Sequence, residues 1–143
     1  MRSAVVDASV AVKWCMPAPE EKLIPKAVEL LASYQSGETR FLVPDLFWIE
    51  IANALWKAVQ REKIFKEFAR AALTSVTDLE IPTISSFDLV PQTLRLAIDN
   101  RRTAYDSLYV ALAVQSKTEL ITADERLANA LAARFPVKWL GAL

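Results

Sequence analysis

Residues 4–15 have the sequence AVVDASVAVKWC, and this stretch decides the fold. Its first three residues are apolar, which predicts a short buried strand over residues 4–6. Asp7 ends that strand, and residues 9–15 follow as a short helix that two nearby prolines close. A strand that passes directly into a helix begins a βαβ unit, so we expect a parallel sheet.

The same alternation of elements continues along the chain. Apolar runs predict further strands over 41–43, 80–84, 119–122 and 137–140. Helical patterns cover 20–36, 46–62, 64–76, 87–100, 104–116 and 124–134, and Asp45 is a good N-cap for the helix at 46–62. Strands separated by helices are joined by right-handed crossovers. We therefore expect a three-layer α/β/α fold with a central, mainly parallel sheet of about five strands, in which residues 1–143 form a single domain.

The composition excludes several kinds of catalytic site. The 143 residues include 17 basic and 17 acidic residues, two glycines, one cysteine and no histidine. A chain without histidine has neither a Ser-His-Asp triad nor a histidine-ligated zinc. One cysteine makes no intrachain disulfide and no iron–sulfur cluster, and two glycines are too few for a phosphate-cradling glycine motif. Catalysis must therefore use carboxylates, hydroxyls, amines or a metal held by oxygen.

The distribution of apolar residues also limits where the protein works. The longest apolar runs are far shorter than the roughly 20 residues of a membrane span, and the first residues lack a signal-peptide pattern. We expect a cytoplasmic protein that makes no membrane contact, with Cys15 as a small buried apolar residue.

Four acidic residues do not fit their surroundings. Asp7 follows the strand at 4–6, and Asp124 lies just past the strand at 119–122. Asp106 stands in the first turn of a helix that is apolar almost all round, and Glu50 interrupts an apolar helix. The carboxyl ends of parallel strands form the edge where ligands bind in such sheets, so all four can meet there.

Each of these acids also has a structural explanation. Asp7 and Asp124 can serve as helix N-caps, and Asp106 can take a cap-like role near Thr103. Glu50 can belong to a narrow polar stripe on a helix that is otherwise buried.

The four acids together point to a metal site. Two unit charges 4 Å apart repel each other by about 4 kcal/mol at an effective dielectric constant near 20, so clustered carboxylates need cations or protons. Sites made only of oxygen ligands suit Mg²⁺ or Mn²⁺. Because histidine is absent, activation of water falls to the metal, and acid clusters with Mg²⁺ typically act on phosphates.

Several motifs resemble those of the PIN domain family, specifically the VapC-type ribonuclease toxins of type II toxin–antitoxin systems. They are VVDASV at 5–10, PDL at 44–46 with Glu50 and Asn53 after it, YDSLYVALA at 105–113 and LITADERL at 120–127. A closing strand, VKWL at 137–140, extends the resemblance to the end of the chain.

The resemblance implies an endoribonuclease that needs Mg²⁺ or Mn²⁺ and leaves a 5′-phosphate and a 3′-hydroxyl. It implies catalytic acids that also hold the metal, Asp7 and Asp106 most directly, with Glu50 and Asp124 completing the set. Three polar residues would lie beside these acids: Ser9, Thr122 and Asn53. The resemblance further implies that a small antitoxin protein inhibits the chain and that the chain forms a homodimer.

Basic residues outside the acidic group could hold RNA. With the four acids set aside, 13 acidic residues remain against 17 basic ones. Three candidates lie on the helix and turn that lead into Asp106: Arg95, Arg101 and Arg102. Lys13 lies close in sequence to Asp7, and a second cluster consists of Lys57, Arg61, Lys63 and Lys66. The alternative for both groups is a solvated helix face.

Aromatic residues could form a groove for the antitoxin. They lie on the predicted helix pair at 46–76, with one more at 14: Phe47, Trp48, Trp56, Phe65, Phe68 and Trp14. The alternative is ordinary core packing, since aromatic residues dominate both cores and interfaces.

Two other functions compete with the ribonuclease. A haloacid-dehalogenase-like phosphatase begins with Asp-x-Asp after its first strand, but here Ser9 stands where the second acid is needed. A catalytically silent binding module of the same fold would not need all four acids, and all four are present.

Overall fold

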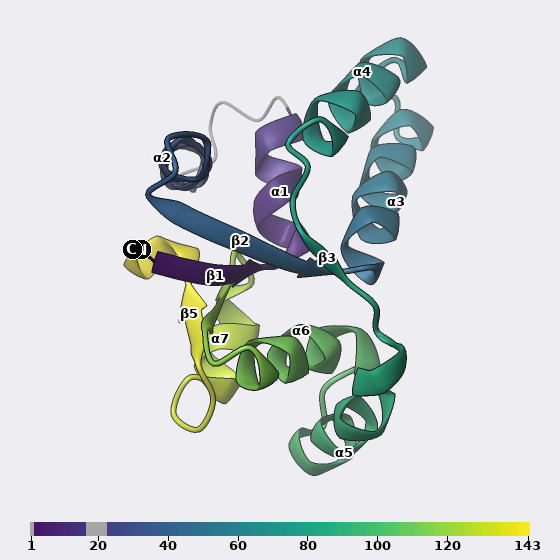
Figure 1. The fold of residues 1–143 in the computed structure, drawn as a ribbon. Coiled ribbons are helices and arrows are strands. Elements are labelled where there is room, and N and C mark those ends of the chain that lie inside the picture. Colours follow the sequence, from purple (N-terminus) through teal and green to yellow (C-terminus); the bar gives the residue numbers. More distant parts are fainter. Residues whose placement is uncertain (1, 17–22) are drawn as a thin grey trace.

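A computed structural model describes residues 2–16 and 23–143 (Figure 1). Five parallel strands form a central sheet in the order β3-β2-β1-β4-β5, which confirms the predicted sheet. The strands are β1 (Arg2–Val6), β2 (Thr39–Pro44), β3 (Thr83–Ile84), β4 (Glu119–Thr122) and β5 (Val137–Trp139).

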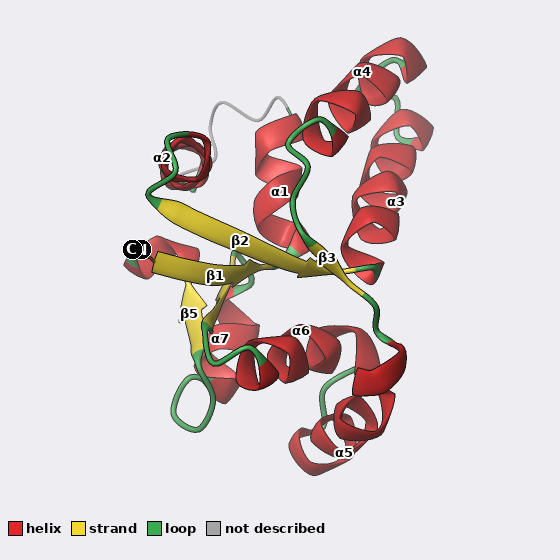
Figure 2. Cartoon of the chain, viewed as in Figure 1, coloured by secondary structure: helices red, strands yellow, loops and turns green. Residues whose placement is uncertain are grey.

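Helices cover both faces of the sheet, as the three-layer prediction requires (Figure 2). One face carries α1 (Ala8–Cys15), α2 (Ile24–Gln35), α3 (Leu46–Gln60) and α4 (Lys66–Thr77). The other carries α5 (Val90–Asn100), α6 (Ala104–Gln115) and α7 (Glu125–Leu131), and two short 3₁₀ turns lie at Phe87–Leu89 and Leu140–Ala142. Within residues 2–16 and 23–143, no helix combines the length and the apolarity that crossing a bilayer demands.

The centre of the molecule lies where α6 packs on β1, β2 and β4. Ala4, Val5 and Val6 of β1 are fully buried. Every residue of α6 from 107 to 113 is buried as well, which confirms that this apolar helix is central. The acid that ends β1 and the acid that begins α6 are therefore carried by the best-packed part of the protein.

The third strand and two helices are shorter than predicted. The strand covers only Thr83–Ile84, because Glu80 adopts a left-handed φ of 52° and Pro82 has no N–H to donate to a neighbouring strand. The helix predicted at 87–100 is a 3₁₀ turn followed by α5, which has Pro91 in its first turn. Of the helix predicted at 20–36, positions 20–22 lie outside the described residues, and α2 begins at Ile24.

Asp45 does not cap α3 as predicted. Its backbone is already helical, and its carboxylate accepts hydrogen bonds from the amide and hydroxyl of Ser86, at 3.1 and 3.2 Å. Asp45 therefore ties the start of α3 to the turn after β3. At the far end, α3 stops at Gln60 because Glu62 takes a left-handed φ of 57°. The remaining predicted boundaries differ by one to three residues, at β1, α1, β2, α4, α6, α7 and β5.

Candidate functional site

Asp7 lies at the carboxyl end of β1 and is 9% exposed. Its Oδ2 atom accepts hydrogen bonds from Ser9 Oγ at 2.6 Å and Thr122 Oγ1 at 2.8 Å. Asp7 occupies the N-cap position of α1, as its structural explanation proposed, but its carboxylate makes no capping bond to the helix. Burial raises the pKa of Asp7, the two hydroxyls lower it, and the charges of Asp106 and Asp124 raise it further.

The two hydroxyls are themselves held by the backbone. Ser9 Oγ accepts the N–H of Ala123 at 3.0 Å, and Thr122 Oγ1 accepts the N–H of Asp124 at 3.0 Å. Each hydroxyl is thus oriented to donate its proton to Asp7. The structure therefore brings Ser9 and Thr122 to the buried acid, from positions 113 residues apart in sequence.

Glu50 is half-buried on α3, where Oε1 accepts a hydrogen bond from Tyr109 Oη at 2.6 Å. Burial raises the pKa of Glu50, the Tyr109 hydroxyl lowers it, and the charges of Asp7 and Asp106 raise it. Tyr109 was not anticipated as a site residue. The sequence feature that could have identified it is its phenol, since a tyrosine in a buried apolar helix needs a hydrogen-bond partner.

The other two acids hydrogen-bond to groups in their own segments. Arg102 Nη2 lies 3.2 Å from Asp106 Oδ2, while the Thr103 hydroxyl caps α6 by accepting the Asp106 N–H at 3.1 Å. Asp124 Oδ1 accepts the N–H of Leu127 at 3.2 Å, so Asp124 is an N-cap of α7, as its structural explanation proposed.

The donor set fits a hard divalent cation. All the groups are oxygens. Burial and, to a smaller extent, mutual repulsion raise the pKa values of Asp7 and Glu50, and a bound cation would offset both effects. In the described part of the chain, no three acidic side chains are oriented so that they could share one ion. Glu50, Asp106 and Asp124 are instead hydrogen-bonded to Tyr109, Arg102 and a backbone N–H.

The remaining polar candidates differ in their exposure and in their contacts. Asn53 is exposed on α3, and the described hydrogen bonds do not join it to Glu50. Arg102 contacts Asp106, whereas Arg95 and Arg101 are exposed on and after α5. Lys13 is half-buried on α1, and burial lowers its pKa.

The aromatic residues divide between core and surface. Phe47 is fully buried and packs edge-on against Trp48, so its predicted place in a groove is wrong. Trp56 is 57% exposed and Phe65 is 83% exposed. Phe68 lines a cavity of about 340 Å³ between α1, α2 and α4, together with Trp14.

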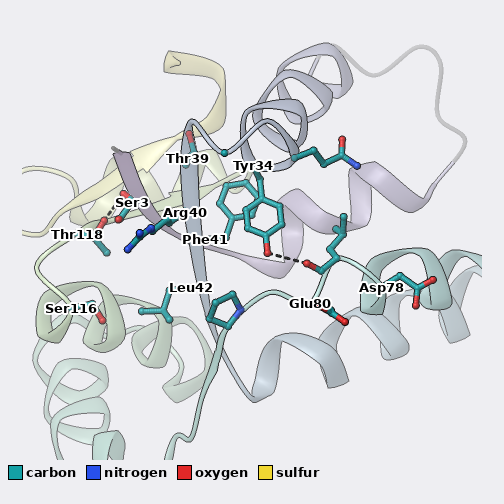
Figure 3. Close-up of a pocket in the computed structure, with 14 residues that line it drawn as sticks. Ser3, Tyr34, Thr39, Arg40, Phe41, Leu42, Asp78, Glu80, Ser116 and Thr118 are labelled. Atoms are coloured by element: carbon teal, nitrogen blue, oxygen red, sulfur yellow. Dashed lines mark hydrogen bonds between the residues drawn. The ribbon is translucent and has the colours of Figure 1, made fainter.

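Two further hollows differ in their position relative to the four acids. One, of about 610 Å³, runs between α3, α5 and α6 and is lined by Ile49 and Tyr105, the sequence neighbours of Glu50 and Asp106. The other, of about 850 Å³, is lined by Ser3, Thr39 and Thr118 at the opposite, amino-terminal end of the strands (Figure 3). The second hollow is therefore separate from the acids.

Comparisons with known proteins agree with one another. The family model of the PIN domain matches residues 4–131. Ribonuclease VapC3 of Pyrobaculum aerophilum is 30% identical over 127 residues, which are 87% of this chain and 92% of that protein.

Solved structures share the fold at lower sequence identity. PAE2754 from Pyrobaculum aerophilum superposes with a TM-score of 0.72 at 21% identity, over 99% of this chain and 85% of that one. VapBC2 from Rickettsia felis, solved with a DNA fragment from its promoter, gives a TM-score of 0.64 at 12% identity, over 96% and 98%.

Proposed function

Because the chain belongs to the PIN domain family, we propose that residues 1–143 form one nuclease domain, an endoribonuclease that cuts RNA phosphodiester bonds with Mg²⁺ or Mn²⁺. The observation that carries this proposal is Asp7, buried at the carboxyl end of β1 and held by two hydroxyls, whose pKa is raised by burial and further by the charges of Asp106 and Asp124. The ribonuclease name of its relative from Pyrobaculum aerophilum supports the choice of RNA.

The four acids have different roles in this proposal. Asp7 and Asp106 would hold the cation most directly, with Glu50 and Asp124 completing the set. A divalent cation in such a site lowers the pKa of water and neutralises charge on a phosphate. Ser9 and Thr122 fix the Asp7 carboxylate through the bonds at 2.6 and 2.8 Å.

Glu50 would accept the proton of the attacking water, and basic residues would bind the RNA backbone. Glu50 has a pKa raised by burial, which brings it closer to the range in which a carboxylate accepts a proton from attacking water. Arg102 stands beside Asp106 and is the cation that we assign to the RNA backbone, with Lys13, Arg95 and Arg101 as further candidates.

The two competing functions are less well supported. In place of the second acid of a haloacid-dehalogenase-like phosphatase stands Ser9, whose hydroxyl donates to Asp7. A silent binding module would have no use for an acid that is disfavoured by burial and by two like charges, since replacing it would remove both costs.

We also propose that the chain is the toxin of a toxin–antitoxin pair and acts in the cytoplasm, where RNA and antitoxin are found. The solved relatives include a toxin–antitoxin complex from Klebsiella pneumoniae. We assign the antitoxin to the cavity between α1, α2 and α4, which Trp14 and Phe68 line. Trp56 on α3 and Phe65 just before α4 are further exposed aromatic residues that we assign to this interface.

A second apolar surface supports a homodimer. Around the hollow between α3, α5 and α6, Ile49, Leu94 and Tyr105 are 68%, 57% and 63% exposed, and Ile98 on α5 is 67% exposed. Exposed apolar groups gathered in one patch mark protein interfaces. Sedimentation of the purified chain, compared with an Ile49→Glu variant, tests this assignment, and a wild type that stays monomeric contradicts it.

Cleavage of RNA by purified protein tests the nuclease proposal. We expect cleavage with Mg²⁺ or Mn²⁺, its loss with EDTA, and losses of at least about 100-fold in Asp7→Asn and Asp106→Asn. Asp88→Asn, an exposed acid in the 3₁₀ turn before α5, is the matched control and should cleave like the wild type. Undiminished cleavage by Asp7→Asn, or in EDTA, would refute the proposal.

A further inference from the structure

The hydroxyl of Tyr109 reaches across the acidic site from α6 to α3. Tyr109 is 1% exposed, and its Oη donates to Glu50 Oε1 at 2.6 Å. The backbone of Ala8, the residue after Asp7, lies beside this hydroxyl. The phenol thus lies between the acid on α3 and the end of β1. We propose that Tyr109 is a positioning residue that holds the Glu50 carboxylate in the acidic site, an inference that rests on the proposed nuclease function.

Core packing alone does not account for a tyrosine at this place. Phenylalanine would fill the same space in α6 without burying a hydroxyl, which costs free energy unless it is hydrogen-bonded. The neighbours of Tyr109 in α6 are apolar, from Leu108 to Ala113. The phenol finds its partner in a carboxylate, and hydrogen bonds to charged groups are shorter and stronger than neutral ones.

The geometry of α6 makes this support specific to the site. Asp106 and Tyr109 are three residues apart, so they lie on one face of the helix. The same helix therefore contributes an acid of its own and fixes an acid of α3. Ser9 and Thr122 likewise hold the Asp7 carboxylate by hydrogen bonds. Burial raises the pKa values of both Asp7 and Glu50, and each of these acids has a hydroxyl donor at 2.6–2.8 Å.

Without the phenol, the Glu50 side chain would lose its anchor. Glu50 is half-buried, so its flexible side chain can turn toward water once the bond at 2.6 Å is removed. The carboxylate would then spend less time facing Asp7 and Asp106, whose charges act on it in the folded protein.

The substitution Tyr109→Phe removes the hydroxyl and keeps the ring. We expect weaker Mn²⁺ binding by about 10- to 100-fold, the usual loss when a group that orients a metal ligand is removed, and a matching fall in kcat for RNA cleavage. KM for RNA should change little, because Tyr109 is buried away from solvent.

Tyr34→Phe is the matched control. The Tyr34 hydroxyl donates to the Leu79 carbonyl at 2.9 Å, beside the hollow at the amino-terminal end of the strands (Figure 3). This variant also loses one tyrosine hydrogen bond, but it should bind Mn²⁺ and cleave RNA like the wild type. An equal loss in both tyrosine variants would overturn the proposal, because it would show a general effect on folding.

A double-mutant cycle with Glu50→Gln separates positioning from packing. If Tyr109 acts through Glu50, the double variant binds Mn²⁺ and cleaves RNA as Glu50→Gln alone does. Losses that simply add would assign Tyr109 to the core and overturn the proposal. A wild type that binds Mn²⁺ without cleaving RNA refutes the nuclease alone, while Tyr109→Phe with unchanged Mn²⁺ affinity refutes the positioning role.

Discussion

Thr122→Val exchanges a hydroxyl for a methyl group of similar shape at the end of β4. Thr122 is fully buried. Its Oγ1 atom donates to Asp7 Oδ2 at 2.8 Å and accepts the N–H of Asp124 at 3.0 Å. The variant therefore removes one bond to a buried charge and leaves one backbone donor without its partner.

The size of the effect follows from these two bonds. A hydrogen bond to a charged group contributes about 1.5–3 kcal/mol, and an unsatisfied buried donor costs about 1–3 kcal/mol. Because Ser9 still donates to Asp7, we expect a net loss of about 2–4 kcal/mol. For 143 residues the entropy of unfolding is about 0.3 kcal/mol per degree, so the melting temperature should fall by about 7–13 °C.

Calorimetric melting of the metal-free protein in EDTA measures this loss. Thr118→Val is the control, since its hydroxyl donates to the Ser3 carbonyl, away from the acids. That variant should lose about 1 kcal/mol, or roughly 3 °C, and cleave RNA normally. A Thr122→Val protein that melts no lower than Thr118→Val would refute the idea that the hydroxyl supports a buried charge.

Three further predictions concern the described core and surface. Burial raises the pKa of Asp7 above its ordinary value of 3.8, so the folded state binds this proton more tightly than the unfolded chain does. The stability that this proton contributes is complete below pH 3.8 and is lost as pH rises through the raised pKa. In urea titrations of metal-free protein, Asp7→Asn should therefore gain stability over the wild type as pH increases, and parallel pH curves would contradict this. Phe47→Ala should lower the free energy of unfolding in urea by about 3–5 kcal/mol, because Phe47 is fully buried. Trp56→Ala should change this free energy by no more than about 0.5 kcal/mol but weaken antitoxin binding, because Trp56 is exposed. Similar losses of stability in both variants would be inconsistent with their burial. Burial raises the pKa of Cys15 to about 11, so a thiol reagent near neutral pH should label it only after unfolding, and rapid labelling of the native protein would be the opposite result.

The acids could be found from sequence because strand ends are visible in it. Asp7 and Asp124 each follow a run of apolar residues, and in a parallel sheet such ends meet at one edge. Asp106 stood out because the helix after it has no polar face. These signals depend on the order of strands and helices along the chain and on the handedness of βαβ connections. Neither requires knowledge of side-chain directions.

The supporting contacts could not be predicted because they depend on side-chain directions. Tyr109 fits the apolar pattern of α6 as well as phenylalanine would, so its bond to Glu50 leaves no periodic signal. Asp45 has the residue type and position of an N-cap, but its carboxylate bonds to Ser86 in the chain after β3 and makes no bond to the amides of α3. Phe47 and Trp56 lie on one helix with apolar residues on several faces, and only packing separates the buried ring from the exposed one.

The most direct test is a titration of metal-free protein with Mn²⁺, monitored by electron paramagnetic resonance. It shows whether four carboxylates from separate elements form one cation site. Asp7→Asn, Glu50→Gln, Asp106→Asn and Asp124→Asn should each weaken Mn²⁺ binding by at least about tenfold, while Asp88→Asn leaves it unchanged. Mn²⁺ affinity in Asp7→Asn equal to that of the wild type would contradict a shared site at the carboxyl edge of the sheet.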